Sequence, residues 1–455
     1  MTLLHILGFI VGALIVLAVT AHIVRTLVVP RARPTMLTHV VDAGVDAFYR
    51  LVTKPLRDYE RKDQVLAGQG AVVLLVQLLT WLVAFELGYA LVLWPFVHGF
   101  PTAMRETGSS MFTLGFASTN GTAPTVVDIL AAASGLVVVA LQIAYLPTLY
   151  SAFNRRETEV TLLTARAGLP PWGPELLVRT RYGVAVRSDD LPAFYNRWER
   201  WAADVAESHS NYPVLIRFRS PQALSSWLVG LLAVMDSAAM LLALCPSRDR
   251  IEPRRAIRMG FTALRQIGVG LGMQSDTDAD PDAEIQLRFE DFAAAVDMLR
   301  LVDFPMERDA AEAWPHFRGW RVNYESLAYV LARHIDAVPA PWSGRRRWPA
   351  ETIPVRRPAN RAPKDAKPPF FLAKDVSSPG KGYAYEGKAT SVVDDGRGTN
   401  VVDDGKGVSV VYDGQGTSVA GPVLGGEQAG DATPADFESD ETECEEVDDV
   451  AERSD

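Results

Sequence analysis

The residues with the clearest chemical potential form a five-residue string, Thr113-Leu114-Gly115-Phe116-Ala117. The string lies in a short segment, residues 102–120, between two long apolar runs at residues 71–96 and 126–153. A bilayer offers no water to unpaired backbone groups, so irregular backbone at membrane depth is tolerated only where protein buries it or where it lines an aqueous path. Span, short helix, glycine-containing turn and span together are typical of a re-entrant pore loop. The chemistry open to such a loop is coordination by backbone oxygens.

The string resembles the selectivity filter of potassium channels, which usually reads Thr-Val-Gly-Tyr-Gly followed by Asp. Thr113, Gly115 and Phe116 stand where that family has Thr, Gly and Tyr, and Leu114 replaces Val conservatively. The resemblance covers residues 70–153. It implies a homotetramer in which four loops offer backbone carbonyls to a dehydrated potassium ion or another monovalent cation. It implies no cofactor beyond the permeating ion.

Two positions depart from the pattern of that family. Ala117 occupies the site of the second Gly, and Ser118 occupies the site of the Asp. A filter that points successive carbonyls inward alternates between left- and right-handed backbone, and only Gly adopts the left-handed form without a steric penalty. Ala117 therefore argues against potassium selectivity, and it also leaves conduction itself open.

Three residues of the run at 126–153 could act below the loop. Gly135 and Gln142 are seven residues apart and share a helix face, and a polar amide on such a face prefers a wet cavity or a partner helix. Pro147 should kink the helix near its inner end, because it cannot donate to the preceding turn. In a channel these residues would line the cavity and form an inner hinge. Ordinary helix packing through small residues is an equally good interpretation.

Glu86 is the one acid in the run at 71–96. An ionisable group at membrane depth is a functional candidate by default. At about 1.5 Å per residue from Ala71, Glu86 falls in the outer third of the span. Arg105, at the start of the expected pore helix, could meet it there. We expect a structural ion pair between Glu86 and Arg105 in preference to a proton or ion site.

Residues 1–29 read as an N-terminal membrane anchor. The apolar run at 3–29 exceeds the roughly 20 residues needed to cross a bilayer. No basic residue precedes this run, whereas Arg25, Arg31 and Arg33 follow within it or just after it. This charge distribution favours an uncleaved anchor with its N-terminus outside over a cleaved signal peptide.

Residues 30–69 carry a basic excess and apolar residues at helical spacing. They predict a cytoplasmic amphipathic helix lying along the membrane interface, or else a plain helical linker. The second span then runs outward, the loop enters from outside and the third span returns. Arg155-Arg156 marks the inner end of the third span. The helical domain that follows is therefore expected in the cytoplasm.

Residues 154–341 predict a soluble helical domain. Asp189-Asp190-Leu191-Pro192 is a helix start signal, with acids at the cap and Pro in the first turn. Asp280-Pro281 predicts a second start, and apolar spacing over residues 324–335 predicts a further amphipathic helix.

One stretch of this domain, residues 223–245, is nearly long enough to span a membrane, although Asp236 interrupts it. Arginines flank both of its ends, so a span would place one basic cluster outside. We therefore interpret this stretch as the buried central helix of the domain.

Residues 342–455 change to a composition of Pro, Lys, Gly, Ser and Asp, which predicts a disordered tail with an acidic end. Residues 390–425 contain nine-residue repeats such as TSVVDDGRG at Thr390. Nonapeptide β-helices bind calcium through glycine-rich turns, but these repeats lack the paired glycines of that motif. Expansion of a solvated linker is the better explanation.

Composition and motifs exclude several classes of function. The chain has 48% apolar residues and a mean hydropathy of +0.06, which average an apolar N-terminal third with a polar tail. The two cysteines, Cys245 and Cys444, form no pairing or metal pattern. The seven histidines are scattered, and no HExxH, GxSxG or phosphate-loop motif occurs. We therefore expect neither an enzyme nor a nucleic-acid-binding protein.

The sequence predicts an all-α integral membrane protein with three transmembrane helices, a re-entrant pore loop, a soluble helical domain and a disordered tail. We expect a multi-pass protein of a bacterial-type plasma membrane, with the lipid bilayer and further copies of itself as partners. A cytoplasmic protein partner is left open. Two functional hypotheses remain: a tetrameric, potassium-channel-like cation channel, and a non-conducting oligomeric anchor or scaffold for the helical domain.

Overall fold

The computed structural model describes residues 3–29, 35–118, 120–182, 190–248, 251–273, 279–280 and 283–345, together with four strands between residues 391 and 420. The chain forms two compact units, residues 1–355 with 365–380 and residues 356–364 with 381–455. The described part of the first unit is helical: α1 (Leu3–Leu27), α2 (Met36–Thr53), α3 (Tyr59–Ala67), α4 (Gln69–Leu93), α5 (Phe100–Met111), α6 (Thr122–Ala167), α7 (Gly173–Arg179), α8 (Leu191–Asn211), α9 (Trp227–Leu244), α10 (Ile251–Gly270), α11 (Phe289–Leu301), α12 (Ala310–Arg321) and α13 (Glu325–His334).

Four helical segments are long and apolar enough to cross a membrane, which indicates a multi-pass membrane protein. They are α1, the nearly continuous stretch Tyr59–Phe96 that includes α3 and α4, α6, and α9. Burial by protein separates α9 from the others. In its most apolar window 94% of the residues are buried, against 17%, 33% and 28% for α1, Tyr59–Phe96 and α6. The last three leave many apolar side chains exposed, as helices in contact with lipid do.

α1 packs along α4 through two glycines. A Cβ added at Gly12 would lie 2.5 Å from the carbonyl oxygen of Gly88, so only glycine allows the backbones to come this close. Nearer the other end of α1, the indole N–H of Trp81 in α4 donates to Nδ1 of His22 at 3.0 Å. Nε2 of His22 lies 3.3 Å from the hydroxyl of Thr38 in α2. One imidazole thus links α1, α4 and α2.

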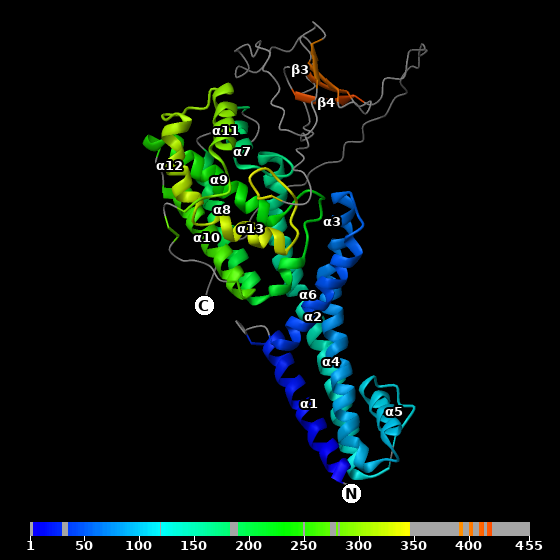
Figure 1. Ribbon diagram of the computed structural model, residues 1–455. Coiled ribbons are helices and arrows are strands. Elements are labelled where there is room, and N and C mark those ends of the chain that lie inside the picture. The colour runs from blue at the N-terminus through cyan, green and yellow to red at the C-terminus, as the bar shows by residue number, and fades with distance from the viewer. Residues whose placement is uncertain are drawn as a thin grey trace, which may run out of the picture. The chain divides into compact units, whose positions relative to one another are not determined.

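α5 is the short helix expected between the two apolar runs, and it lies beside α4 and α6 (Figure 1). It follows Gly99, whose φ of +93° lets the chain turn sharply after α4 and the 3-10 turn Trp94–Phe96. Pro101 stands in its first turn, where a missing backbone N–H costs nothing. The chain therefore reverses direction before and after a helix of only 12 residues.

α6 is a single helix of 46 residues that contains Pro147. The sequence placed the inner end of the third span at residue 153, next to Arg155-Arg156, but the helix continues to Ala167 and contacts α8 and α9. The helix continues because its second half is covered by the helical domain, where Val160, Leu163 and Ala167 belong to the core.

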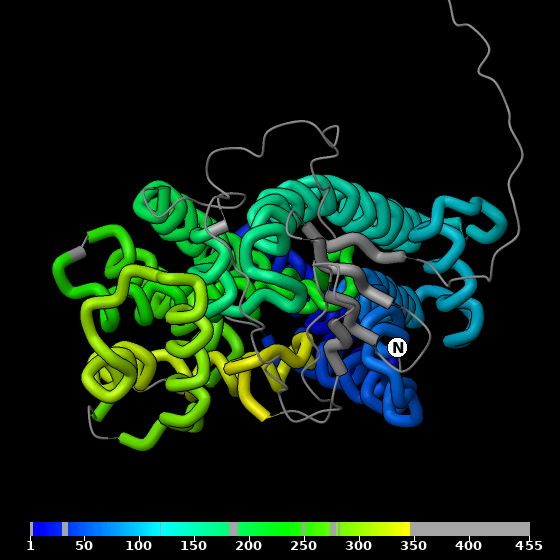
Figure 2. The backbone as a smooth tube through the Cα atoms, turned by 90° about the horizontal axis from the view of Figure 1, so that it is seen from above, coloured from blue at the N-terminus to red at the C-terminus, as the bar shows by residue number. Residues whose placement is uncertain are grey.

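The helices of the domain pack around α9 (Figure 1), and Figure 2 shows the green and yellow segments of the domain from a second side. α8 begins at Leu191, as its start signal predicted, and its expected apolar face is buried. The start predicted at Asp280-Pro281 is wrong, because α11 begins only at Phe289. The reason is a tertiary contact: the backbone N–H groups of Gln286 and Leu287 donate to the carboxylate of Glu325. That bonding holds the preceding residues outside a helix.

The described part of the second unit is an antiparallel sheet in the order β1-β2-β3-β4: β1 (Ser391–Asp394), β2 (Asn400–Asp403), β3 (Ser409–Asp413) and β4 (Gly416–Ala420). The first three strands start nine residues apart, so each repeat contributes one strand. Paired valines favour strands, and the Asp-Gly that follows them favours turns. The acidic end and most of the tail expected to be disordered lie outside the described residues.

Candidate functional site

Two glycines allow α5 to pack closely against α4 and α6. A Cβ added at Gly108 in α5 would lie 3.1 Å from the carboxylate of Glu86 in α4. A Cβ added at Gly135 in α6 would lie 2.4 Å from the carbonyl oxygen of Met111, at the end of α5. A side chain at residue 135 would therefore force the end of α5 away from α6, and with it the string that follows.

Ser109 in α5 accepts hydrogen bonds from three backbone amides of the filter-like string. The N–H groups of Leu114 and Gly115 both donate to the carbonyl oxygen of Ser109, at 2.8 and 3.3 Å. The N–H of Ala117 donates to the hydroxyl of Ser109 at 3.0 Å. Sequence reasoning missed Ser109, whose only signal is its place four residues before Thr113.

These bonds set the direction of the carbonyl groups. In a trans peptide the N–H and the preceding C=O point in opposite directions, and the one cis peptide among the described residues is Leu169-Pro170. The carbonyls of Thr113, Leu114 and Phe116 therefore point away from α5. The side chains of Leu114 and Phe116 are 63% and 55% exposed, so the loop is open in the single chain.

The backbone of the string alternates in handedness over part of its length. Thr113 has a φ of +53° and Gly115 a φ of +70°, both in the left-handed region. Ala117 is not left-handed. Left-handed backbone costs an L-residue about 1–2 kcal/mol, so Thr113 is strained while Gly115 is not. A Cβ added at Gly115 would meet nothing within 4 Å, so backbone conformation alone requires glycine there.

The expected cavity residues are covered within the single chain. Gly135 and Gln142 are both buried and share one face of α6 with Val138, as their spacing predicted. That face meets other helices of the same chain. The exposed face of α6 is apolar instead and carries Leu136, Val137, Val139 and Ile143. Pro147 lies inside a helix that continues past it, and no ligand-lining role for these residues follows from the single chain.

Glu86 and Arg105 have different neighbours. One carboxylate oxygen of Glu86 is buried without a hydrogen-bond partner, at the point where Gly108 passes. The guanidinium of Arg105 lies over the ring of Phe116, 5.5 Å from its centroid. Within the described ranges no ion pair of 4.0 Å or less joins Glu86 to Arg105. Arg105 therefore contacts the filter-like string itself, through a cation–π interaction.

Sequence reasoning also missed an acid that joins α5 to α6. The hydroxyl of Ser110 donates to the carboxylate of Asp128 at 2.9 Å. The side chain of Asp128 also lies beside that of Glu106, which is almost fully buried in α5. The available signal was Asp128 itself, an acid near the start of an apolar run.

Arg156, expected at the inner end of the third span, is fully buried in protein. Its guanidinium pairs with Glu157 and donates to the carbonyls of Leu215 and Phe218 at 2.9 and 2.6 Å. It also donates to Nε2 of His209 at 3.0 Å. Burial, and then the charge of Arg156, lowers the pKa of His209 well below its ordinary value, so this imidazole is neutral. The guanidinium thus fixes α6 to the segment that leads into α9.

Ion pairs fasten that segment to α2 and α3. Arg217 pairs with Asp46 at 2.9 Å and with Asp42 at 3.4 Å, and Arg219 pairs with Asp63. Burial alone would lower the pKa of Arg217, but its two carboxylate partners raise it above the ordinary value. The sequence treated these arginines as topology markers, whereas the structure uses them as tertiary contacts between segments far apart in the chain.

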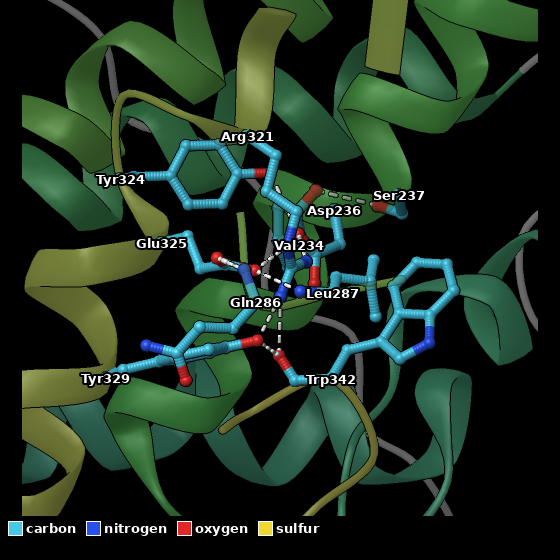
Figure 3. Close-up of polar contacts among 10 residues, drawn as sticks. All are labelled: Val234, Asp236, Ser237, Gln286, Leu287, Arg321, Tyr324, Glu325, Tyr329 and Trp342. Carbon is cyan, nitrogen blue, oxygen red and sulfur yellow. Dashed lines mark hydrogen bonds and ion pairs between the residues drawn. The ribbon is translucent and has the colours of Figure 1, made fainter. Parts of the chain in front are cut away.

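A buried polar cluster surrounds the one acid of α9 (Figure 3). Arg321 is fully buried and donates to the carboxylate of Asp236. The hydroxyl of Tyr324 also donates to Asp236, at 2.8 Å. Other N–H groups of Arg321 donate to the carboxylate of Glu325, the hydroxyl of Tyr329 and the backbone carbonyl of Trp342. The acid that interrupts the apolar stretch is therefore matched by partners from α12 and the residues after it.

Within the described ranges, no group of three or more His, Cys, Asp or Glu side chains is placed to hold a metal ion. Comparisons with protein-family models, curated proteins and solved structures found no match to this chain. The functional conclusion therefore depends on the geometry of the loop and of the helices around it.

Proposed function

We propose that this chain forms a potassium-channel-like cation channel, in which the loop after α5 supplies backbone carbonyls to a dehydrated cation. The observation that carries the proposal is the common direction of three amides, those of Leu114, Gly115 and Ala117, which all donate to Ser109. The corresponding carbonyls therefore share the opposite direction, away from α5. Carbonyl oxygens presented together in this way can replace the hydration shell of an ion.

A complete ring of carbonyls requires several chains, because each chain has one such loop. The proposed assembly is a homotetramer with the loops around the central axis. The exposed apolar residues on the loop, Leu114 and Phe116, and on the outer face of α6 support an assembly, since copies of the chain or lipid would cover them.

The topology we propose has three spans, α1, α4 and α6, with the N-terminus outside and the helical domain in the cytoplasm. α9 stays within that domain, because its acid is bonded to Arg321 and Tyr324 and almost all of its surface is covered by protein. A charge of this kind would be costly in lipid without those partners. The exposed apolar residues Phe48 and Leu51 of α2 support its place along the inner membrane interface.

The helical domain is proposed to assemble or gate the pore. α6 runs without a break from the loop into the domain, and Arg156 and Arg217 fix that domain to α6 and α2. A displacement of the domain would therefore move α6, against which Met111 packs at Gly135. Coupling through a continuous helix of this kind is a physical route from domain to loop.

Ion selectivity is proposed to be weaker than the strict preference for potassium. Thr113 and Gly115 adopt the left-handed backbone that alternation requires, but Ala117 does not. Fewer successive carbonyls are therefore aligned than in a loop with a second glycine. We expect a pore that passes sodium as well as potassium.

The test compares two glycines with similar, left-handed φ angles. Gly115 has a φ of +70° and Gly272, in the helical domain, a φ of +74°, and a Cβ added at either would meet nothing within 4 Å. An alanine at either position costs about 1–2 kcal/mol, which shifts the local equilibrium about 5- to 30-fold in each chain. Only Gly115→Ala should lower the current of the purified protein in a planar bilayer under opposed potassium and sodium gradients.

The outcome separates the two functional hypotheses. Current that Gly115→Ala lowers and Gly272→Ala leaves unchanged supports the pore, and the reversal potential then reports its selectivity. Absence of current from a protein shown to be a folded tetramer would reject conduction. It would favour the second hypothesis, a non-conducting anchor for the helical domain, which the lack of left-handed backbone at Ala117 also favours.

A further inference from the structure

His22 lies in α1 at the point where α1 meets α2 and α4. Only 8% of its surface is exposed, and Trp81 of α4, which faces it, is 1% exposed. The indole N–H of Trp81 donates to Nδ1 of His22 at 3.0 Å, and the hydroxyl of Thr38 in α2 lies 3.3 Å from Nε2. Both ring nitrogens thus contact neighbours from other helices. The contact of His22 with Trp81 and Thr38 is called the His22 latch below.

The chemistry of Trp81 fixes where the proton of the imidazole lies. An indole N–H can only donate, so Nδ1 of His22 must accept and carries no proton. In a neutral imidazole the one proton then lies on Nε2, which donates to the hydroxyl of Thr38. That hydroxyl lies 3.2 Å from the hydroxyl of Thr35 and can donate to it in turn. The latch is therefore closed only while the imidazole is neutral and in this tautomer.

A second proton on the imidazole would open the latch. It would bind to Nδ1, where the indole N–H of Trp81 already points, and two donors cannot form a hydrogen bond with each other. The two rings lie at 66° with the indole edge toward the imidazole, and the edge of an aromatic ring carries partial positive charge. The hydroxyl of Thr26, one turn further along α1 and 3.4 Å from Nδ1, can accept from the charged ring instead. The charged ring would thus keep a partner on α1 and lose its partner on α4.

The charges around the latch do not compensate a protonated ring. Within one turn of the three latch residues, the groups that carry charge near neutral pH are Arg25 on α1 and His39 and Asp42 on α2, and α4 has none. Arg25 and His39 are exposed and add only positive charge. Asp42, the one acid, already pairs with Arg217 at 3.4 Å. α6, which also contacts α1, carries no charged residue from 129 to 154.

We propose that the His22 latch is a proton-sensitive switch, which joins α1 and α2 to α4 while the imidazole is neutral and releases them when it is charged. The helix that it would free, α2, carries Asp42 and Asp46, which pair with Arg217 of the helical domain. Opening would therefore loosen the link between α4 and the domain that runs through α2. In the topology proposed above, the latch lies near the inner end of α1 and responds to acid in the cytoplasm. The switch itself does not depend on conduction by the loop.

The test measures hydrogen exchange of the full chain in detergent by mass spectrometry, at about pH 7.5 and about pH 5.5. The amides of interest are those of residues 20–27 in α1 and 39–45 in α2. Their exchange, corrected for the pH dependence of the exchange reaction itself, is proportional to the population of the open latch. Because only the open form takes up the proton, as an ordinary histidine does near pH 6.5, that population should rise about tenfold between the two pH values.

Two variants and a control identify the group that responds. His22→Asn keeps an acceptor for Trp81 in its amide oxygen but cannot titrate, so exchange should stay at the closed level at both pH values. Trp81→Phe removes the donor, so exchange should already be high at about pH 7.5 and should rise less than about twofold on acidification. His39→Asn is the matched control, because His39 is an exposed histidine beside Thr38. The acid response of the wild type should persist in it.

A rise in exchange that His22→Asn removes and His39→Asn keeps supports the switch. The proposal is overturned if acid raises exchange in the wild type no more than in His22→Asn, or if His39→Asn abolishes the rise. If His22→Asn does not fold, Trp81→Phe decides the matter, because a full tenfold rise in that variant would show that the indole bond does not control the response. None of these results requires a current, so a loop that does not conduct would leave them unchanged.

Discussion

Replacing Arg321 by Met should destabilise the helical domain more than any exposed arginine can. Arg321 forms ion pairs with Asp236 and Glu325. Arg321→Met leaves these two buried carboxylates without their cationic partner. Removing one partner of a buried ion pair costs about 3–5 kcal/mol. Because Met fills a similar volume, the loss of stability measures the missing charge and its hydrogen bonds and not the creation of a cavity.

The size of the effect can be stated as a change in melting temperature. For a domain of this size each kcal/mol shifts the midpoint by about 2–4 °C, so Arg321→Met should lower it by about 6–20 °C. The matched control is Arg300→Met, because Arg300 pairs with Asp297 while both side chains stay largely in solvent. An exposed pair contributes at most about 1 kcal/mol, which corresponds to a shift below about 4 °C.

The assay is thermal unfolding of the purified full chain in detergent, followed by tryptophan fluorescence. A double variant sharpens it: with Asp236→Asn present, Arg321→Met should cost less, by about 0.5–3 kcal/mol, because one of the two stranded charges has gone. If Arg321→Met shifts the midpoint no more than Arg300→Met, the cluster does not hold α9 in place. The argument that partners within the domain compensate Asp236 would then fail.

Three further predictions follow from single contacts. Burial and the charge of Arg156 lower the pKa of His209 in the folded chain, whereas the unfolded chain binds that proton below about pH 6.5. The free energy of unfolding should therefore fall by about 1.4 kcal/mol for each pH unit below 6.5. His209→Gln should flatten a plot of melting temperature against pH. Gly135→Ala should destabilise the protein by about 1–3 kcal/mol through its clash with the end of α5, whereas Gly44→Ala, which meets nothing within 4 Å, should be neutral or stabilising in the same melting assay. A cysteine in place of the exposed Arg254 should react with a membrane-impermeant maleimide only after cells are permeabilised; labelling of intact cells would show that α9 crosses the membrane.

Local signals in the sequence predicted the elements that depend on local chemistry. Continuous apolar runs predicted the helices that became α1, α4 and α6, because length and hydropathy are properties of the segment itself. The acids before Leu191 and the proline after it predicted where α8 begins, since these act within one turn. The Asp280-Pro281 signal had the same form and failed, because Glu325 captured the backbone donors that followed it.

The candidate site was recognisable from the sequence only as a string. Gly115 was marked by its residue type, and the structure gives it the left-handed backbone that such a residue allows. The role of Ser109, which orients the loop amides, could not be read from spacing, because it depends on how the chain folds back after α5. The neighbours of Glu86 and Arg105 were likewise set by packing, with Gly108 at one and Phe116 at the other.

The sequence by itself determined which long segments are apolar enough for a membrane, and it marked Gly115 as a position where the backbone needs glycine. Only the tertiary structure decided which charges are structural. Arg156, Arg217 and Arg321 look alike in the sequence, as basic residues near apolar stretches, yet each is buried against a different carboxylate. The physical reason is that hydropathy and backbone conformation are local, whereas the partner that makes a buried charge tolerable comes from another part of the chain.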